Sequence, residues 1–181
     1  DKSLNLSLGY VNLSRKINNL DIYFRFTPSV DLWNTKKGSW KRIIPNINKE
    51  NLIKVCAYSL KNSLIYFLKK NSLKVNLNLI CDNSNEYFNN ELLSLIQNKY
   101  FDVNLFMSKK KGNRGSYLEC CDLANNAKDL ILFVEDDYLF EENFVEESLY
   151  AYSKIASLLK EDIFLCPSDY TFFYDKNYQT Y

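Results

Sequence analysis

Three adjacent carboxylates, Glu135, Asp136 and Asp137, directly follow the apolar run LILFV. On an extended chain Glu135 and Asp137 point to one side and Asp136 to the other, so two carboxylates can converge on one hard cation. Neighbouring carboxylates repel one another unless a positive group offsets them, and Mg²⁺ or Mn²⁺ with oxygen ligands is the usual solution. The triplet therefore predicts a divalent metal site. The alternative is that these acids favour the start of a following helix, as Glu141 and Glu142 would.

Polar residues that suit ligand binding also end two other apolar runs. Thr27 follows the run IYFRF, and Asp82, with Asn83 and Ser84 after it, follows the run LNLIC. The carboxyl ends of parallel strands share one edge of a sheet, where ligands collect, so we expect these residues to lie near the acidic triplet. For each residue alone, turn chemistry or a helix cap is the alternative.

The segment SKKKGNRGS, residues 108–116, places four cations and two glycines between an expected strand and an expected helix. Gly112 and Gly115 permit close approach of the backbone, and the cations of the segment, Lys109, Lys110, Lys111 and Arg114, are expected to face a phosphate at the helix start. The pattern matches neither the Walker motif nor G-x-G-x-x-G, so a solvated basic loop is the alternative. The chain has no histidine, which leaves carboxylates, hydroxyls, amides and cations for any chemistry.

Short β-type runs alternate with amphipathic helical patterns from residue 20 onward, which predicts an α/β fold with a mostly parallel sheet flanked by helices. Residues 1–19 are expected to form an N-terminal arm or an edge strand. The expected strands are Leu20–Phe26, Val75–Cys81, Val103–Met107, Leu130–Val134 and Ile163–Cys166. Apolar residues three and four apart predict the helices, with stripes at Leu52, Cys56, Leu60 and Leu64 and at Val145, Leu149, Tyr152 and Ala156.

The composition excludes several classes of protein. A net charge of +1 over 181 residues gives no electrostatic footprint for nucleic acid. No apolar run approaches the roughly 20 residues that span a bilayer, so we expect no integral membrane segment. Five cysteines without metal-like spacing are typical of reduced thiols, which predicts a cytoplasmic protein. Because the chain begins with Asp1 rather than Met, we expect a piece of a longer protein.

The order and spacing of these features resemble the family 2 glycosyltransferases and their relatives of the GT-A fold, a Rossmann-like architecture. The match runs from about residue 20 to residue 166. It includes a strand that ends at Asp82, an N-x-G turn at Asn113–Gly115, and ILFVEDD where the family has a strand ending in its D-x-D motif. The resemblance implies a nucleotide-sugar-binding domain of GT-A type over residues 20–181, with a short or missing C-terminal acceptor part.

The resemblance also implies roles for individual residues. Asp82 would bind the base, and Thr27 would lie near the nucleoside of the donor. In relatives whose motif is E-D-D the last acid is the main metal ligand, which assigns Mn²⁺ or Mg²⁺ to Asp137. Asp136 would then contact the ribose or the sugar, with Glu135 in support.

Two departures from the family bear on catalysis. Glu119, Cys120 and Cys121 stand where many members carry A-R-N, so this helix lacks the family's donor-contacting residues there. Few residues follow the triplet, and in CPSDYTFFYD the candidate catalytic base is Asp169, with Asp175 as a second possibility. The alternative for that segment is a turn followed by an aromatic core strand.

The sequence therefore predicts a metal-dependent glycosyltransferase. It would move a sugar from a UDP- or GDP-sugar to a hydroxyl of a glycan, lipid or protein acceptor, with a carboxylate deprotonating that hydroxyl. One alternative is a catalytically incomplete GT-A-like module that binds a partner. A metal-dependent nucleotidyltransferase is another, because it also combines a nucleotide-binding α/β fold with acidic metal ligands.

Overall fold

The computed structural model describes residues 12–29 and 47–167. The chain forms two compact units, one spanning Ile17–Glu146 and the other joining the residues up to Lys16 with those from Glu147 onward. Asp169, the expected catalytic base, and Asp175 lie outside the described residues, as do residues 1–11 of the expected N-terminal arm. Within residues 12–29 and 47–167, no helix has both the length and the apolar character needed to cross a bilayer.

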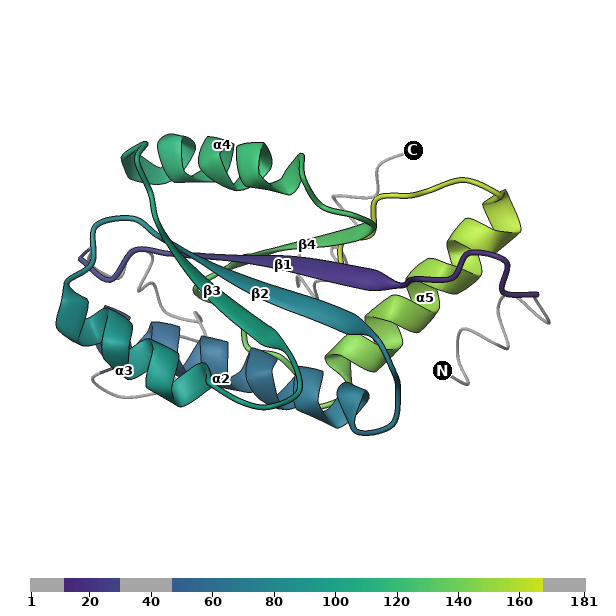
Figure 1. The fold of residues 1–181 in the computed structure, drawn as a ribbon, viewed down its shortest axis with the longest axis horizontal. Helices are drawn as coiled ribbons and strands as arrows, with labels where there is room; N and C mark the ends of the chain where they lie inside the picture. Colours follow the sequence, from purple (N-terminus) through teal and green to yellow (C-terminus); the bar gives the residue numbers. More distant parts are fainter. Residues whose placement is uncertain (1–11, 30–46, 168–181) are drawn as a thin grey trace, which may run out of the picture. The chain divides into compact units, whose positions relative to one another are not determined.

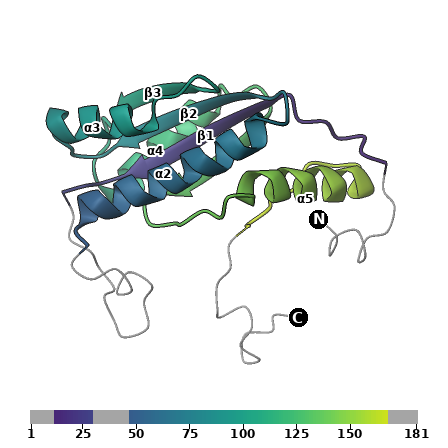
Figure 2. The same ribbon diagram turned by 90° about the horizontal axis from the view of Figure 1, so that it is seen from below.

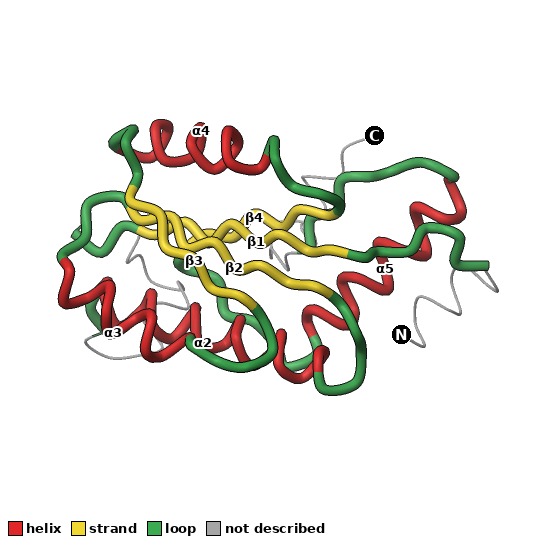
Figure 3. The backbone as a smooth tube through the Cα atoms, in the orientation of Figure 1, coloured by secondary structure: helices red, strands yellow, loops and turns green. Residues whose placement is uncertain are grey.

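The larger unit is built on a four-stranded sheet in which all strands are parallel, in the order β3-β2-β1-β4 (Figure 3). The strands are β1 (Asn19–Phe26), β2 (Lys74–Cys81), β3 (Asp102–Met107) and β4 (Leu130–Glu135). These bounds agree to within one residue with four of the five sequence-predicted strands. The expected α/β architecture with a parallel, helix-flanked sheet is confirmed.

The helices are α2 (Lys49–Leu68), α3 (Glu86–Ile96), α4 (Gly112–Ala124) and α5 (Phe144–Leu159). Figures 1 and 2 show α2 and α3 on one face of the sheet and α4 on the opposite face. The crossovers through α2 and α3 step from β1 to β2 to β3, whereas the crossover through α4 returns past β1 to β4. Crossovers of one hand that run in opposite directions must lie on opposite faces. The change of direction puts the topological switch point between β1 and β4.

The face of the sheet under α2 and α3 holds the main hydrophobic core. Ile22 and Phe24 of β1 and Leu77 and Leu79 of β2 point to this face and are fully buried. The stripe predicted for the first helix is buried against it, and consists of Leu52, Cys56, Leu60 and Leu64. Asparagines cap the N-termini of both helices. The side chains of Asn48 and Asn85 accept hydrogen bonds from backbone N–H groups of the first turns.

The face under α4 is only partly apolar. Tyr23 and Ile80 pack with Cys120 and Ala124 of the helix in a small buried cluster. Nearer the amino ends of the strands, Asp21 accepts hydrogen bonds at 2.6 Å from the side-chain amides of Asn19 and Asn76. In register with Tyr23, Asn104 donates to Asn78 at 3.1 Å. Parallel strands are usually apolar on both faces. Here hydrogen bonds between polar side chains replace part of the apolar packing on this face.

The fifth predicted strand, Ile163–Cys166, is not formed. These residues follow α5 as an irregular segment, and the side chain of Phe164 is fully exposed. Asp162, directly before the segment, is held within the smaller unit by Arg15 at 2.7 Å and by the Tyr152 hydroxyl at 2.8 Å. An apolar run becomes a strand only where another strand pairs with it, and no described residue does so here.

Gly115 provides a test of the packing between α4 and the preceding loop. A Cβ at this position would lie 2.9 Å from the carbonyl carbon of Lys110, a distance at which the backbone must move. We expect Gly115→Ala to lower the free energy of unfolding by about 1–3 kcal/mol. Leu118→Ala, at an exposed position of the same helix, should change it by less than about 0.5 kcal/mol. Urea denaturation measures both, and equal values would contradict the close packing.

Candidate functional site

Asp136 joins three segments at the carboxyl edge of the sheet. Its Oδ2 accepts a hydrogen bond from the backbone N–H of Thr27 at 3.0 Å, and its Oδ1 accepts one from Lys49 Nζ at 2.6 Å. The side chains of Lys49 and Asp136 are 15% and 13% exposed. Thr27 follows β1, Asp136 follows β4, and Lys49 begins α2. Two of the sequence-predicted donor residues are thus in direct contact at the topological switch point.

Glu135 pairs with a cation from the neighbouring strand. Arg25 lies opposite Glu135 in the register of β1 and β4, and Arg25 Nη2 donates to Glu135 Oε1. Arg25 Nη1 also donates to the backbone oxygen of Asn113 at 2.7 Å and to the Ser116 hydroxyl at 3.3 Å. Arg25 therefore connects the acidic triplet with the first turn of α4, where the N-x-G turn lies.

The acidic triplet is arranged differently from the sequence-based expectation. The strand ends at Glu135, and Asp136 and Asp137 lie in a turn, so the alternation of an extended chain does not continue through all three. Arg25 and Lys49 pair with two of the three carboxylates and so offset part of their mutual repulsion. The helix that follows, α5, begins only at Phe144, so the triplet does not form its first turn.

Asp82 is buried directly after β2, and its side chain caps α4, which begins 30 residues later in the chain. Its Oδ2 accepts a hydrogen bond from the backbone N–H of Gly112 at 2.8 Å, while its own N–H donates to Phe26 O at 3.0 Å. Lys111, the residue before α4, makes no side-chain cap. A carboxylate at a helix N-terminus is favourable, both as a hydrogen-bond acceptor and as a negative charge. Asp82 thus brings the start of α4 to the same edge as Thr27 and Asp136.

The residues after Asp82 serve mainly as turn chemistry, as the alternative hypothesis held. Asn83 adopts a left-handed backbone conformation with φ of 61°, which asparagine tolerates better than most residues. Its side-chain amide donates to the Ser29 hydroxyl at 2.9 Å, which ties together the loops after β1 and β2. The Ser84 hydroxyl donates to Asn89 Oδ1 at 2.6 Å within the start of α3.

Glu119 of α4 holds the basic loop after β3, a contact that the sequence did not predict. Glu119 Oε2 accepts hydrogen bonds from the Ser108 hydroxyl at 2.7 Å and from the backbone N–H groups of Lys109 at 2.7 Å and Lys110 at 3.1 Å. The Ser108 hydroxyl is the largest of the causes that hold the pKa of Glu119 below its usual value. Glu119 thus holds the backbone of the loop, while the side chains of its cations are exposed, as in the alternative of a solvated basic loop: Lys109, Lys110, Lys111 and Arg114.

Cys120, which follows Glu119 on α4, has a structural role. Cys120 lies in the core cluster under α4, and its burial raises the pKa of the thiol to about 11. The thiol therefore stays protonated near neutral pH.

Sequence-based reasoning missed Arg25 and Lys49, the two cations of the site. Arg25 had one detectable signal, because a charged residue near the end of an otherwise apolar strand needs a partner. Lys49 had a weaker one. A cation in the first turn of a helix opposes the helix dipole, which suggests a nearby anion.

The carboxylates fit a divalent ion only in part. Among residues 12–29 and 47–167, no three Cys, Asp or Glu side chains gather as a metal site. Magnesium often takes one or two protein carboxylates and completes its shell with phosphate oxygens and water. Glu135 and Asp136 are already paired with cations of the chain, so their charge is partly compensated without a metal ion.

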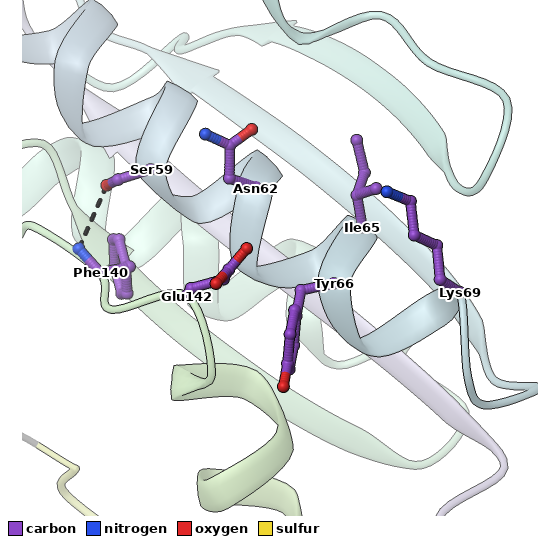
Figure 4. A pocket seen from close by; sticks show the side chains of 7 residues that line it. All are labelled: Ser59, Asn62, Ile65, Tyr66, Lys69, Phe140 and Glu142. Atoms are coloured by element: carbon purple, nitrogen blue, oxygen red, sulfur yellow. Dashed lines mark hydrogen bonds between the residues drawn. The ribbon is translucent and has the colours of Figure 1, made fainter.

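A separate pocket of about 370 Å³ lies between the second half of α2 and the loop before α5 (Figure 4). The backbone N–H of Phe140 donates to the Ser59 hydroxyl at 3.1 Å across it. None of the sequence-predicted site residues contributes to its lining, which consists of Ser59, Asn62, Ile65, Tyr66, Lys69, Phe140 and Glu142. The pocket is distinct from the carboxyl edge.

Comparison of the chain with protein-family models, with curated proteins and with solved structures finds no match. A functional hypothesis must therefore be supported by the geometry of the site and the chemistry of its residues.

We predict that Asp136→Asn destabilises the protein by about 2–4 kcal/mol, because it leaves the Lys49 ammonium without its counter-charge in a largely buried site. Asp122→Asn is the matched control. This substitution breaks an exposed ion pair, in which the Asp122 side chain is 63% exposed and the Lys110 side chain 48%. It should lower the free energy of unfolding by less than about 0.5 kcal/mol. Thermal and urea unfolding measure both variants. Equal losses would mean that the Lys49–Asp136 pair is not a structural contact.

The depressed pKa of Glu119 predicts an acid-sensitive contribution to stability. Because the folded-state pKa lies below the ordinary value of 4.5, the contribution is present above that value and is lost as the pH falls through the folded-state pKa. Glu119→Gln should remove this part of the acid dependence of stability. Urea unfolding of the wild type and of Glu119→Gln between pH 7 and pH 3 tests this prediction. It would be contradicted if the free energy of unfolding of the two proteins fell in parallel with pH.

Proposed function

We propose that this chain is the nucleotide-sugar-binding domain of a glycosyltransferase of GT-A type. The donor would lie along the carboxyl edge of the sheet, across the switch point between β1 and β4. Crevices at such switch points are the usual ligand sites of open α/β sheets.

One observation carries the proposal. Thr27 and Asp136, assigned to the donor from separate parts of the sequence, meet at 3.0 Å at this switch point. Asp82 and the N-x-G turn are brought to the same edge by the hydrogen bonds of Gly112 and Asn113. The strand order supplies this convergence, and it occurs where a bound nucleotide would be expected.

The groups at this edge suit a nucleoside diphosphate. Amides and carboxylates such as Asp82 can hydrogen-bond a base and a ribose, and the cations Arg114, Lys109 and Lys111 are exposed beside the start of α4 for phosphate. In transfer, an acceptor oxygen attacks the anomeric carbon while the bond to the diphosphate breaks. A carboxylate takes the proton of the acceptor hydroxyl, for which Asp169 is the candidate.

A divalent ion held by Asp137 would act as a Lewis acid toward the departing diphosphate, which leaves with increasing negative charge. The resemblance to E-D-D relatives assigns the ion to Asp137. The remaining ligands of the ion would be phosphate oxygens and water.

The proposal predicts that Asp137→Asn, which keeps the shape of the side chain and removes its charge, lowers metal-stimulated release of nucleoside diphosphate by at least about 100-fold, the scale of losing one transition-state contact. The exposed Glu141→Gln, four positions along in the same acidic stretch, should retain nearly full release. The assay is release of UDP or GDP from a panel of nucleotide sugars with Mn²⁺ or Mg²⁺. Equal effects of the two substitutions would contradict the role of Asp137.

The same assay, extended to nucleoside triphosphates with sugar phosphates, separates the alternatives. Release of pyrophosphate from a nucleoside triphosphate and a sugar phosphate would identify a nucleotidyltransferase instead. Binding of a nucleotide sugar without turnover, in a protein that contains its full C-terminal part, would favour a partner-binding module. No binding of any nucleotide sugar would contradict both the proposed reaction and the proposed site.

A further inference from the structure

The carboxyl edge contains its own cations at the places where a diphosphate would need positive charge. Lys49 Nζ lies 2.6 Å from Asp136 Oδ1, and Arg25 Nη2 pairs with Glu135. Both cationic side chains are largely buried, 15% exposed for Lys49 and 13% for Arg25. Two of the three carboxylates of the triplet are thereby neutralised by the chain itself.

Lys49 occupies an unusual position for a cation. It is the first residue of α2, where unsatisfied N–H groups give the helix a positive end that disfavours lysine. Asn48 caps only one of these groups, by accepting from Asn51 N at 2.8 Å. The ammonium is tolerated because Asp136 offsets it. Any group that takes the place of Asp136 beside Lys49 must also be an anion.

Asp136 can release Lys49 without losing all its partners. Its second oxygen, Oδ2, is bonded to the backbone N–H of Thr27 at 3.0 Å, on the other side of the carboxylate. The ammonium is a compact charge on a flexible four-carbon stem, so it can reorient to a new oxygen over a short distance. Arg25, by contrast, is fixed by Asn113 and Ser116 as well as by Glu135.

We propose that, in the donor site on which the proposed function rests, Lys49 meets the diphosphate of the nucleotide. Its ammonium exchanges Asp136 Oδ1 for a phosphate oxygen when the donor binds. Nucleotide binding then needs no divalent ion, and the ion that Asp137 would hold serves the transfer step instead. The chain's own cation, not the metal, determines affinity for the diphosphate.

Calorimetric titration with UDP and with GDP tests this, in EDTA and in Mn²⁺. The wild-type chain should bind one of the nucleotides with dissociation constants that differ by less than about threefold between the two conditions. Lys49→Met should weaken binding by at least about tenfold in EDTA, as expected for loss of one charge-assisted hydrogen bond. Lys54→Met is the matched control on the same helix. Lys54 pairs with Glu91 of α3 at 2.7 Å, and its loss should leave binding within about twofold of the wild type.

Lys49→Met also leaves Asp136 without its cation, so its folding must be verified by circular dichroism. The double variant Lys49→Met with Asp136→Asn removes both charges together, and a folded double variant that binds as tightly as the wild type in EDTA would overturn the inference. Binding that requires Mn²⁺ would overturn this inference while leaving the proposed function intact. Equal affinities of Lys49→Met and Lys54→Met would overturn it as well. Absence of binding to either nucleotide in both conditions would overturn the inference and the proposed function together.

Discussion

The carboxylate of Asp136 is the contact on which the carboxyl edge of the sheet depends. Strands of a parallel sheet end in separate loops, and no ladder hydrogen bonds hold those loops together beyond the last paired residues. Here one side chain accepts from the loop after β1 and from the first residue of α2, and its own backbone continues β4. Without it, Lys49 would remain as an uncompensated cation at the positive end of a helix. The geometry of the site and the start of α2 therefore depend on the same ion pair.

A second set of contacts extends this arrangement to α4. Arg25 reaches from β1 to Glu135 and to the first turn of α4, and Asp82 accepts the first N–H of that helix. The helix in turn packs Gly115 against Lys110 and holds the basic loop through Glu119. Acids and cations thus alternate along the edge. Arg25 and Lys49 thereby compensate the charges of Glu135 and Asp136 within the chain itself.

The sequence predicted the scaffold well because burial leaves a strong pattern. Strands covered by α2 and α3 must be apolar on the face that these helices cover. The alternating apolar residues of β1 and β2 made both strands recognisable in the sequence, among them Ile22, Phe24, Leu77 and Leu79. The stripe of α2 followed from its helical period for the same reason. The segment 163–166 is as apolar as the segments that form strands, but no described strand pairs with it. An apolar run does not by itself reveal whether a pairing partner exists.

The candidate site was only partly predictable. Strand order brought Thr27, Asp82 and the triplet to one edge as expected, since parallel strands end together. The ion pairs were not foreseen, because Lys49 and Arg25 meet partners 87 and 110 residues away, and no local pattern encodes such a distance. The alternation argument also failed beyond Glu135, where the chain leaves the strand for a turn. Charge compensation is a property of the folded edge rather than of any segment.

The central claim is that a nucleoside diphosphate binds at the carboxyl edge between β1 and β4. Titration of the ¹⁵N-labelled protein with UDP or GDP, followed through backbone amide resonances, tests it most directly. We predict saturable shifts of the Thr27 and Gly112 amides, whose hydrogen-bond acceptors are Asp136 and Asp82, and no shift for Asn62 and Tyr66. Shifts confined to the pocket that Asn62 and Tyr66 line, or no shifts at all, would contradict it.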